Sequence, residues 1–592
     1  MPSPNRRICR MLTLEKQVTR RPTIAILITM IVSVAVGGCS TVPRIDTGGY
    51  SNQPADQNTN AVARASFPSC SDSPVHAWSK SVTECDSKLF VGIAISGGGS
   101  RAANFGIGAL WELQQLGILD HATALSSVSG GSLAATYVAL HGLDSRTKFD
   151  AAAEAMRQDF LGAWALRSMN PYRVLRVNTT HDSATNTLAD TFDSLLFHGR
   201  TFSNLGSFGP GRPYLYINAS LQNLVTARKD LTTRGANAPS GSLQGFTFTQ
   251  AAFSEIGSDL ENYRLADAVA SSGAYPGLFE PMVLRNYLDD SRPGDPPDAY
   301  LHLADGGLAD NLGVDALLRA LQETRNSILN PEREPQACLL ILVDAAVQTP
   351  LENEGAKEDL RVSPLNSVVS SSLKRGYDIL LDRRREEQLD RLGINVSSDT
   401  AVRFNPSVDV PFGNYSYVDL GTSKSRARGP NIRQIGPHGV ISHTTCAVWH
   451  ISFDHLAEVA GLNNRFQREN YGPWTRLPDP LNDDIAGSTK KMDYFINSVG
   501  TNYKLVLDRG NGCSAKDVQH AIFDAASMLV RSDDTTLNAL SGWLKANHEP
   551  PLASSVERGE EPLSKPSSME AVSVTQGEGG VITGGPTCHT SH

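Results

Sequence analysis

The sequence predicts an α/β fold with a mostly parallel central sheet. The apolar, β-branched run Leu89–Ile95 ends in glycines, as a buried parallel strand often does. Apolar residues at helical spacing follow over Ala103–Leu116, and Gly117 is placed to end that helix. A second short strand over Ala122–Val128 and a second helix over Ser132–His141 repeat this order. Strand, glycine turn and helix in alternation indicate a sheet with crossover helices.

The later elements continue this alternation. Apolar runs predict further strands over Pro213–Ala219, Leu301–Ala304 and Cys338–Val343. Between them, Asp267–Gly277 reads as a helix that runs into a proline turn. Leu373–Leu392 is amphipathic, with Arg, Glu and Asp on one side, which predicts a long surface helix.

Residues 1–38 have the features of an export signal. Basic residues precede a short apolar run from Thr23 to Val36, and two glycines lead to Cys39. A transmembrane anchor is the alternative, but about fourteen apolar residues fall short of the roughly 20 that a spanning helix needs. The segment resembles a bacterial lipoprotein signal, cleaved before Cys39 with that cysteine acylated. With Ser40 rather than Asp next, we expect lipid anchoring in the cell envelope, at the outer membrane of a Gram-negative bacterium and facing the periplasm.

Composition suggests how the rest of the chain is divided. We expect a flexible tether over residues 39–85, an α/β domain over 86–350 and a C-terminal extension packed on it over 351–548. Residues 549–592, rich in Pro, Gly, Ser, Thr and Glu, predict a disordered tail. The formal net charge of -9 argues against nucleic acid as a partner.

Cysteine usage fits an exported protein. Besides Cys9 and Cys39, an even number remains, and in an oxidising compartment these permit disulfides in many pairings. We expect a local bridge between Cys70 and Cys85, and we expect Cys338, which opens the buried run C-L-L-I-L-V, to be free. The remaining cysteines are Cys446, Cys513 and Cys588.

Ser129 stands where the second strand meets the second helix, in the segment S-S-V-S-G-G-S. A serine on such a turn has an exposed hydroxyl, and its neighbours must be small because strand and helix pass close together. Gly130 and Gly131 meet this demand, whereas Ser127 replaces the first glycine of the G-x-S-x-G pattern. A serine that merely caps the helix is the alternative. Ser132, a turn inside the helix, fits a structural role.

A glycine-rich loop follows the first strand. Gly97, Gly98 and Gly99 allow backbone N–H groups to turn inward at a helix N-terminus, so the loop can hold an oxyanion. Arg101 can lock that loop or face anionic headgroups. The spacing fits neither a P-loop nor a dinucleotide-binding fingerprint, which argues against nucleotide binding.

Asp305 follows the apolar stretch Tyr300–Ala304 and precedes two glycines. A carboxylate at a strand end can approach a serine from a neighbouring strand and act as its base. A turn aspartate is the alternative for Asp305, and Asp310 is the competing carboxylate, with a turn or cap as its expected role. His302 lies three residues before Asp305 and so faces the other side of the strand. A Ser-Asp dyad is therefore favoured over a triad.

Several histidines gather late in the chain. They fall with one cysteine between His438 and His455, but the segment is interleaved with apolar residues and its spacing matches no known zinc site. We expect these histidines to be ordinary core and surface residues, and we expect no metal or other cofactor. The other members are His443, Cys446 and His450.

Together these segments resemble the patatin-like phospholipase family. The family's blocks are a G-G-G-x-R oxyanion loop, a serine elbow and an aspartate in D-G-[GA]. The segments Ala270–Pro281 and Phe248–Phe253 are similar to two further blocks, and the resemblance runs from Phe90 to Val343. It implies a three-layer α/β/α sandwich, a Ser129–Asp305 dyad, and hydrolysis of lipid acyl esters without metal.

The expected function is therefore that of a serine lipid acyl hydrolase, similar to phospholipase A or lysophospholipase. Its partners would be a phospholipid or another acyl-ester lipid, and the membrane through the N-terminal anchor. A catalytically weak envelope protein that holds lipid in the same cleft is the alternative. A histidine-dependent α/β-hydrolase esterase is a third possibility.

Overall fold

The computed structural model places the α/β core and part of the C-terminal half of the chain. The residues it describes are 49–55, 89–205, 213–222, 244–254, 256–287, 300–327, 337–346, 371–394, 402–412, 416–419, 431–434, 442–455, 515–531 and 533–547. The predicted signal segment, the predicted acylation site Cys39, the predicted Cys70–Cys85 bridge and the predicted tail lie outside these residues.

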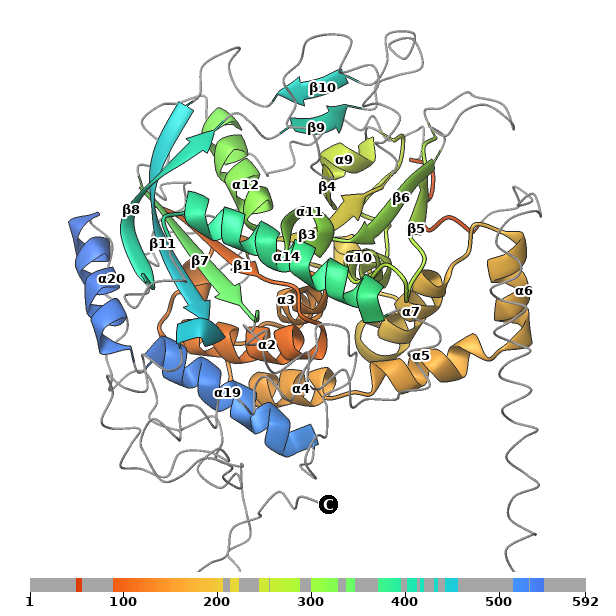
Figure 1. Ribbon diagram of the computed structural model, residues 1–592, viewed down its shortest axis with the longest axis horizontal. Helices are drawn as coiled ribbons and strands as arrows, with labels where there is room; N and C mark the ends of the chain where they lie inside the picture. The colour runs from red at the N-terminus through yellow and green to blue at the C-terminus, as the bar shows by residue number, and fades with distance from the viewer. Residues whose placement is uncertain are drawn as a thin grey trace, which may run out of the picture.

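A central sheet organises the described part of the chain (Figure 1). The strand order is β5-β6-β3-β2-β1-β7-β11-β8, with β4 paired to β3. The inner strands β3, β2, β1, β7 and β11 run parallel, while β4, β5, β6 and β8 add antiparallel pairings at the two sides. The strands are β1 (Leu89–Ile95), β2 (Ala124–Val128), β3 (Tyr214–Leu221), β4 (Gln244–Thr247), β5 (Met282–Arg285), β6 (Tyr300–Asp305), β7 (Ala337–Asp344), β8 (Phe404–Phe412) and β11 (Ser442–Ser452). A separate two-stranded sheet pairs β9 (Ser416–Asp419) with β10 (Asn431–Gln434).

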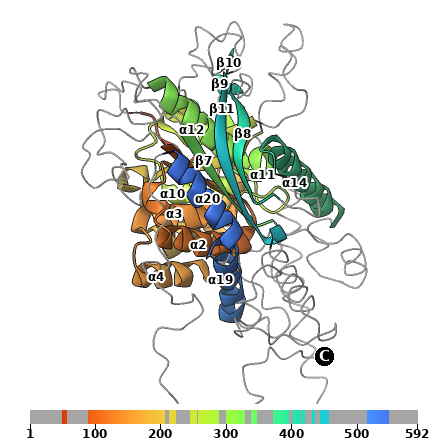
Figure 2. The same cartoon turned by 90° about the vertical axis from the view of Figure 1, so that its left-hand side faces the viewer.

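Helices cover both faces of this sheet, which makes the three-layer sandwich that the sequence predicts. Figure 1 shows α14 crossing in front of the strands, and Figure 2 shows α2, α3 and α4 on the side away from α14. The helices are α2 (Gly99–Gln115), α3 (Gly130–His141), α4 (Arg146–Met156), α5 (Phe160–Ser168), α6 (Pro171–Thr179), α7 (Ala184–Phe192), α9 (Gln250–Ser254), α10 (Leu265–Ser272), α11 (Gly307–Asp310), α12 (Val314–Ser327), α14 (Ser371–Arg391), α19 (Ala515–Arg531) and α20 (Asp534–Ala546).

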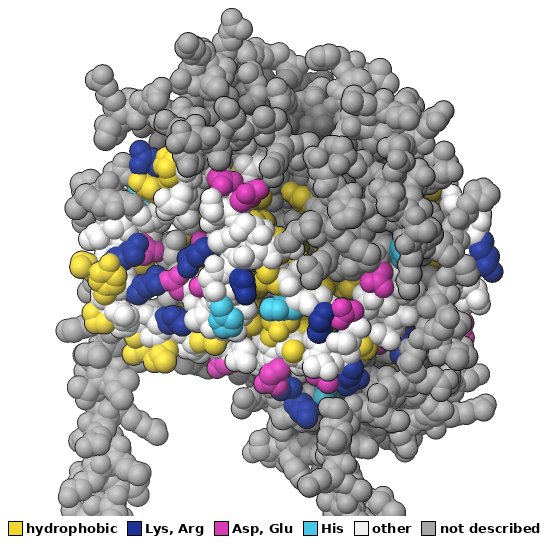
Figure 3. All heavy atoms as spheres, turned by 180° about the vertical axis from the view of Figure 1, so that it is seen from behind, with side chains coloured by type: hydrophobic (Ala, Val, Ile, Leu, Met, Phe, Trp, Pro, Cys, Tyr) yellow, Lys and Arg dark blue, Asp and Glu magenta, His cyan; other side chains and the backbone are white. Residues whose placement is uncertain are grey.

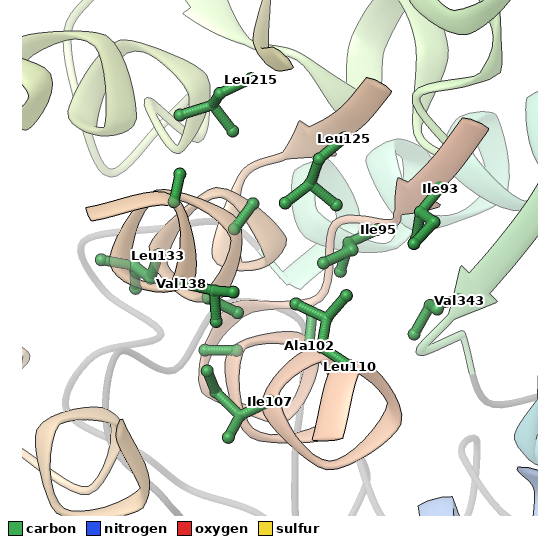
Figure 4. Close-up of a cluster of buried hydrophobic side chains, with 14 of the residues drawn as sticks. Ile93, Ile95, Ala102, Ile107, Leu110, Leu125, Leu133, Val138, Leu215 and Val343 are labelled. Carbon is green, nitrogen blue, oxygen red and sulfur yellow. The ribbon is translucent and has the colours of Figure 1, made fainter. Parts of the chain in front are cut away.

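The apolar core lies on both faces of the sheet because successive side chains of a strand point in opposite directions. In β1, Ile93 and Ile95 pack into the cluster that contains α2 and α3, as Figure 4 shows. Phe90 and Ala94 of the same strand belong to the cluster on the other face, which includes α12 and the end of α14. All of β1 is buried, as expected for an inner parallel strand.

The predicted elements are present with shifted ends. β1 has the predicted bounds, and β2, β3, β6 and β7 differ by one or two residues at an end. Helix α2 begins at Gly99, four residues before the predicted start, because its first turn is formed by the glycine loop itself. α14 is confirmed as a long helix, but Arg385 points inward and is 3% exposed, whereas Ile379 and Leu380 are exposed.

Elements beyond residue 350 complete the same sheet. β11 pairs in parallel with β7, and β8 pairs with β11. α19 contributes Phe523 and Leu529 to the core cluster around α2. The region predicted as an extension thus supplies two strands to the sheet as well as helices on its surface.

The prediction that Cys338 is free is wrong. Cys338 and Cys446 form a disulfide, with their Cα atoms 4.6 Å apart. The two residues are direct register partners in β7 and β11, so the parallel pairing itself brings them within bonding distance. Burial in an apolar strand therefore did not imply a free thiol.

The bridge is expected to stabilise the fold. It joins residues separated by 108 positions, so Cys338→Ala/Cys446→Ala should lower the free energy of unfolding by about 2–5 kcal/mol. Denaturant unfolding with and without reductant measures this, and reductant should not affect the double variant at this site. Alkylation of both thiols in unfolded, unreduced protein would contradict the bridge.

Within the described residues, no helix is both long enough and apolar enough to span a bilayer.

Candidate active site

Ser129 occupies the sharp turn between β2 and α3. Its backbone has φ 51° and ψ -122°, and it is one of two non-glycine residues with positive φ in the described part of the chain. Such a conformation strains an L-residue and is typical of a nucleophile elbow. A Cβ at Gly130 would overlap the carbonyl oxygen of Gly99, and one at Gly131 would lie 2.5 Å from that of Ser96. The predicted need for small neighbours is thus met at both glycines.

Ser272, at the end of α10, holds this turn in place. Its buried hydroxyl accepts the backbone N–H of Ser129 at 2.8 Å and donates to the carbonyl of Asn218 at 2.5 Å. The hydroxyl of Ser132 lies 3.1 Å from Oγ of Ser272, which supports the structural role expected for Ser132. Ser272 is the second serine of the A-S-S-G block, but no local sequence pattern assigned it a role.

Asp305, at the end of β6, meets the Ser129 side chain. The Ser129 hydroxyl donates to Oδ2 of Asp305 at 3.1 Å, and the Gly307 N–H donates to Oδ1 at 2.8 Å. Burial raises the pKa of Asp305 to about 6, while the hydrogen bonds from Gly307 and Ser129 act in the opposite direction. The carboxylate is therefore ionised at neutral pH but more basic than an exposed aspartate.

Among the described residues, no histidine takes part in this arrangement. Neither Ser129 nor Asp305 is hydrogen-bonded to a histidine in the part of the chain that the structure places. His302 precedes Asp305 by three positions in β6, so the two side chains leave the strand on opposite faces. The described contacts join Ser129 directly to Asp305.

Asp310, the competing carboxylate, is held in a structural role. Its Oδ1 accepts the N–H of Gly313 at 2.7 Å and the side-chain amide of Gln388 at 2.7 Å. Its Oδ2 accepts the N–H of Asp315 at 2.8 Å, in the first turn of α12. Asp310 is thus a cap for α12, as expected of it.

The glycine loop lies against the nucleophile elbow, but its three amides are not equivalent. A Cβ at Gly97 would be 3.5 Å from Cβ of Ser129, so loop and serine are neighbours. The Gly97 N–H already donates to the carbonyl of Asn311 at 3.0 Å, so the predicted oxyanion role of Gly97 is not supported. Gly98 and Gly99 have φ 145° and 59°, and their amides have no acceptor among the described residues. They remain the candidate oxyanion donors.

Asn311 ties the glycine loop to the aspartate segment. The carbonyl of Asn311 accepts the Gly97 N–H. The side-chain Oδ1 of Asn311 would overlap a Cβ placed on Gly97, and it lies 2.9 Å from the position that a Cβ on Gly307 would take. Both glycines are needed for this close approach. Asn311 ends the D-G-G-L-A-D-N block, but no local sequence pattern assigned it a role.

Arg101, in the first turn of α2, is 4% exposed. The sequence left two roles for it, loop locking and contact with anionic headgroups. Its burial favours loop locking.

His450 and His455 belong to a buried ionic cluster at the ends of β7 and β11. His450 Nε2 lies 3.0 Å from Oδ2 of Asp344, and its Nδ1 lies 2.9 Å from Nε2 of His455. Burial alone would raise the pKa of Asp344, but Arg385 and His450 hold it well below its usual range. Burial, His450 and Arg403 lower the pKa of His455 to about 2, so that ring is neutral.

This cluster has the character of a structural network. Cys446 belongs to the disulfide, and the side chains of His438 and His443 lie outside the described residues. In the described ranges, no three His, Cys, Asp or Glu side chains are grouped so that they could hold a metal ion.

Comparisons with known proteins agree with the site blocks. The family model of the patatin-like phospholipases matches residues 93–318, which include the glycine loop, Ser129 and Asp305. No curated protein sequence matches the chain. Among solved structures, human GIVD cytosolic phospholipase A2 matches at 13% identity and a TM-score of 0.37, covering 77% of this chain and 60% of the human protein. VipD from Legionella pneumophila matches at 12% identity and a TM-score of 0.19, covering 80% of this chain and 89% of VipD.

This chain spans only about 60% of the length of the human enzyme. The assignment depends on the family model together with the sheet order and the elbow described above. Residues 93–318 of this chain carry a patatin-like phospholipase domain.

Proposed function

We propose that the protein is a serine lipid acyl hydrolase of the phospholipase A or lysophospholipase type, with Ser129 as nucleophile and Asp305 as its base. The observation that carries this is the 3.1 Å hydrogen bond from the Ser129 hydroxyl to the Asp305 carboxylate, formed on a strained elbow. A buried carboxylate with a pKa of about 6 is charged at neutral pH and accepts the serine proton more readily than an exposed one.

The mechanism follows from these contacts. Ser129 Oγ attacks the ester carbonyl as its proton passes to Asp305 Oδ2, and the negative charge that develops on the carbonyl oxygen faces the amides of Gly98 and Gly99. The tetrahedral intermediate expels the alcohol, which takes the proton from Asp305. Water, activated by the same carboxylate, then releases the fatty acid from Ser129.

Labelling with a fluorophosphonate probe tests the nucleophile. The wild-type protein should be labelled and should release fatty acid in a screen of lipid classes, and Ser129→Ala should lose both. Ser132→Ala is the matched control, since that serine lies in the same motif and should still permit labelling. Labelling lost only in Ser132→Ala would overturn the assignment. Lipid binding without labelling would favour the lipid-binding alternative.

We also propose that the protein is lipid-anchored in the envelope through Cys39, on the sequence features given above. Wild-type protein should partition into the detergent phase, and Cys39→Ser should accumulate as an unprocessed or aqueous form. Phase separation in detergent followed by immunoblotting measures this. Wild-type protein in the aqueous phase would contradict the anchor.

A further inference from the structure

Helix α6 is unusually exposed to solvent for a helix of a folded domain. None of its side chains is fully buried, although five of its nine residues are apolar. Four large apolar side chains of the α5–α6 segment are among the most exposed in the described chain: Leu166 (74%), Met169 (70%), Tyr172 (63%) and Leu175 (60%). We call these four residues the α5–α6 face. Figure 3 shows hydrophobic side chains together with Lys or Arg at the left-hand edge, the side on which α6 lies in that view. An exposed apolar group of this kind marks a contact surface.

The α5–α6 segment itself carries basic and no acidic side chains. Residues 160–180 contain Arg167, Arg173 and Arg176 and no Asp or Glu, in a chain with a formal net charge of -9. Arg176 pairs with Asp182, which is 2% exposed, and Arg173 pairs with Asp182 and with the partly exposed Asp190. The side chains of Arg173 and Arg176 are themselves 25% and 39% exposed, so both guanidinium groups still reach the surface. Apolar side chains flanked by arginines on a short helix are typical of segments that lie in the interface of an anionic membrane.

The chain enters the fold beside this face. A Cβ at Gly49 would overlap the backbone of His181 and Asp182, and the ring of Tyr50 lies 6.2 Å from that of His181. These residues directly follow α6. Cys39 lies ten residues before Gly49, so even a fully extended chain could carry it no more than about 35 Å from this point. A lipid anchor at Cys39 would therefore hold the membrane near the α5–α6 face.

The face is also connected to the candidate active site. The Trp164 ring of α5 packs edge-on against Phe279 at 5.2 Å between ring centres. Phe279 belongs to the segment after α10, where a Cβ at Gly273 would be 3.8 Å from Ser129 Oγ. In the same segment the carbonyl of Ala274 accepts the N–H of Asp305 at 3.0 Å. α5 thus packs on the segment that borders both members of the dyad.

We propose that the α5–α6 face docks on a phospholipid bilayer with anionic headgroups, so that the enzyme meets its substrate at the membrane surface. The proposal rests on the lipid hydrolase function and on the Cys39 anchor proposed above. Leu166, Met169, Tyr172 and Leu175 enter the interface, and the arginines lie at headgroup level.

Vesicle co-sedimentation tests this with the mature chain from residue 39 onward, carrying Cys39→Ser so that no acyl group contributes. Binding to phosphatidylcholine vesicles that contain phosphatidylglycerol should exceed binding to phosphatidylcholine alone. Leu166→Ser/Leu175→Ser should lower the partition coefficient at least about tenfold, because two apolar side chains no longer leave water on docking. The matched control Ile379→Ser/Leu380→Ser removes two comparably exposed side chains from α14 and should bind as the parent chain does.

Failure of the docking proposal and failure of the proposed function give different results. Ser129→Ala should bind vesicles normally, and Leu166→Ser/Leu175→Ser should still hydrolyse a short-chain, water-soluble ester. Binding by a parent chain that hydrolyses no ester would overturn the function and leave the docking surface standing. Unchanged binding in Leu166→Ser/Leu175→Ser, or equal loss in the α14 control, would overturn the docking surface. So would a change from dimer to monomer in that variant without any change in vesicle binding, since the face would then contact a second copy.

Discussion

Asp305→Asn is expected to lower ester hydrolysis by about 10²–10⁴-fold while the protein remains folded, because the amide keeps the shape of the side chain but cannot accept the serine proton. The measurement is kcat/KM on a lipid or soluble ester, with circular dichroism as the check on folding. Asp310→Asn is the control, since that carboxylate caps α12 and contacts neither Ser129 nor Asp305. Asp310→Asn should be less stable than wild type but should hydrolyse the ester at the wild-type rate. Loss of hydrolysis in Asp310→Asn, with full activity in Asp305→Asn, would show that Asp310 is the base.

The raised pKa of Asp305 also predicts how the stability of the protein depends on pH. Its folded pKa of about 6 lies above the unfolded value of about 3.9, so the native state binds more protons between these values and stability falls as pH rises through this window. Asp305→Asn removes the buried charge and should raise the free energy of unfolding by up to about 3 kcal/mol at pH 8, with little effect below pH about 4.

Activity should show the opposite dependence, since the base works only when ionised. We expect kcat/KM to fall about tenfold per unit as the pH drops below about 6. Denaturant unfolding at the two pH values and a pH–rate profile measure these effects. An Asp305→Asn variant that is less stable than wild type at pH 8 would contradict the burial-induced pKa shift.

Local sequence patterns predicted the strands and the two reacting groups because these depend on short-range constraints. β1 is a continuous apolar run, and Ser129 is marked by glycines that the turn requires within two residues. The start of α2 was missed because Gly99 and Ser100 are poor helix formers in isolation, and their helical conformation depends on packing within the fold.

The supporting contacts could not be predicted in this way. Ser272 is 143 positions from Ser129, and Asn311 meets Gly97 only because their strands and loops converge at one edge of the sheet. Each is a single polar residue without a local signature. The same holds for Cys338 and Cys446, whose pairing depends on the parallel register of β7 and β11 rather than on spacing.

Gly98→Ala is expected to lower kcat by about 10²–10³-fold, because it tests the oxyanion donors directly. Gly98 has φ 145°, a conformation that an alanine rarely adopts, so the substitution should rotate the peptide planes on either side of it. The amide that faces the developing negative charge would then turn away, with a loss of about 2.7–4 kcal/mol of transition-state stabilisation.

The control for Gly98→Ala lies at a glycine whose positive φ is remote from the site. Gly117, with φ 76° at the end of α2 and open space around its Cα, should tolerate alanine with a small loss of stability and no change in kcat. Steady-state kinetics on the same ester then separate the two positions. KM of Gly98→Ala should stay close to wild type, since the amide acts only on the charge of the transition state, whereas the strained φ at this position should cost some stability, as at Gly117. Equal kcat in Gly98→Ala and wild type would mean that this loop does not hold the oxyanion, and donors elsewhere around Ser129 would have to replace it in the mechanism.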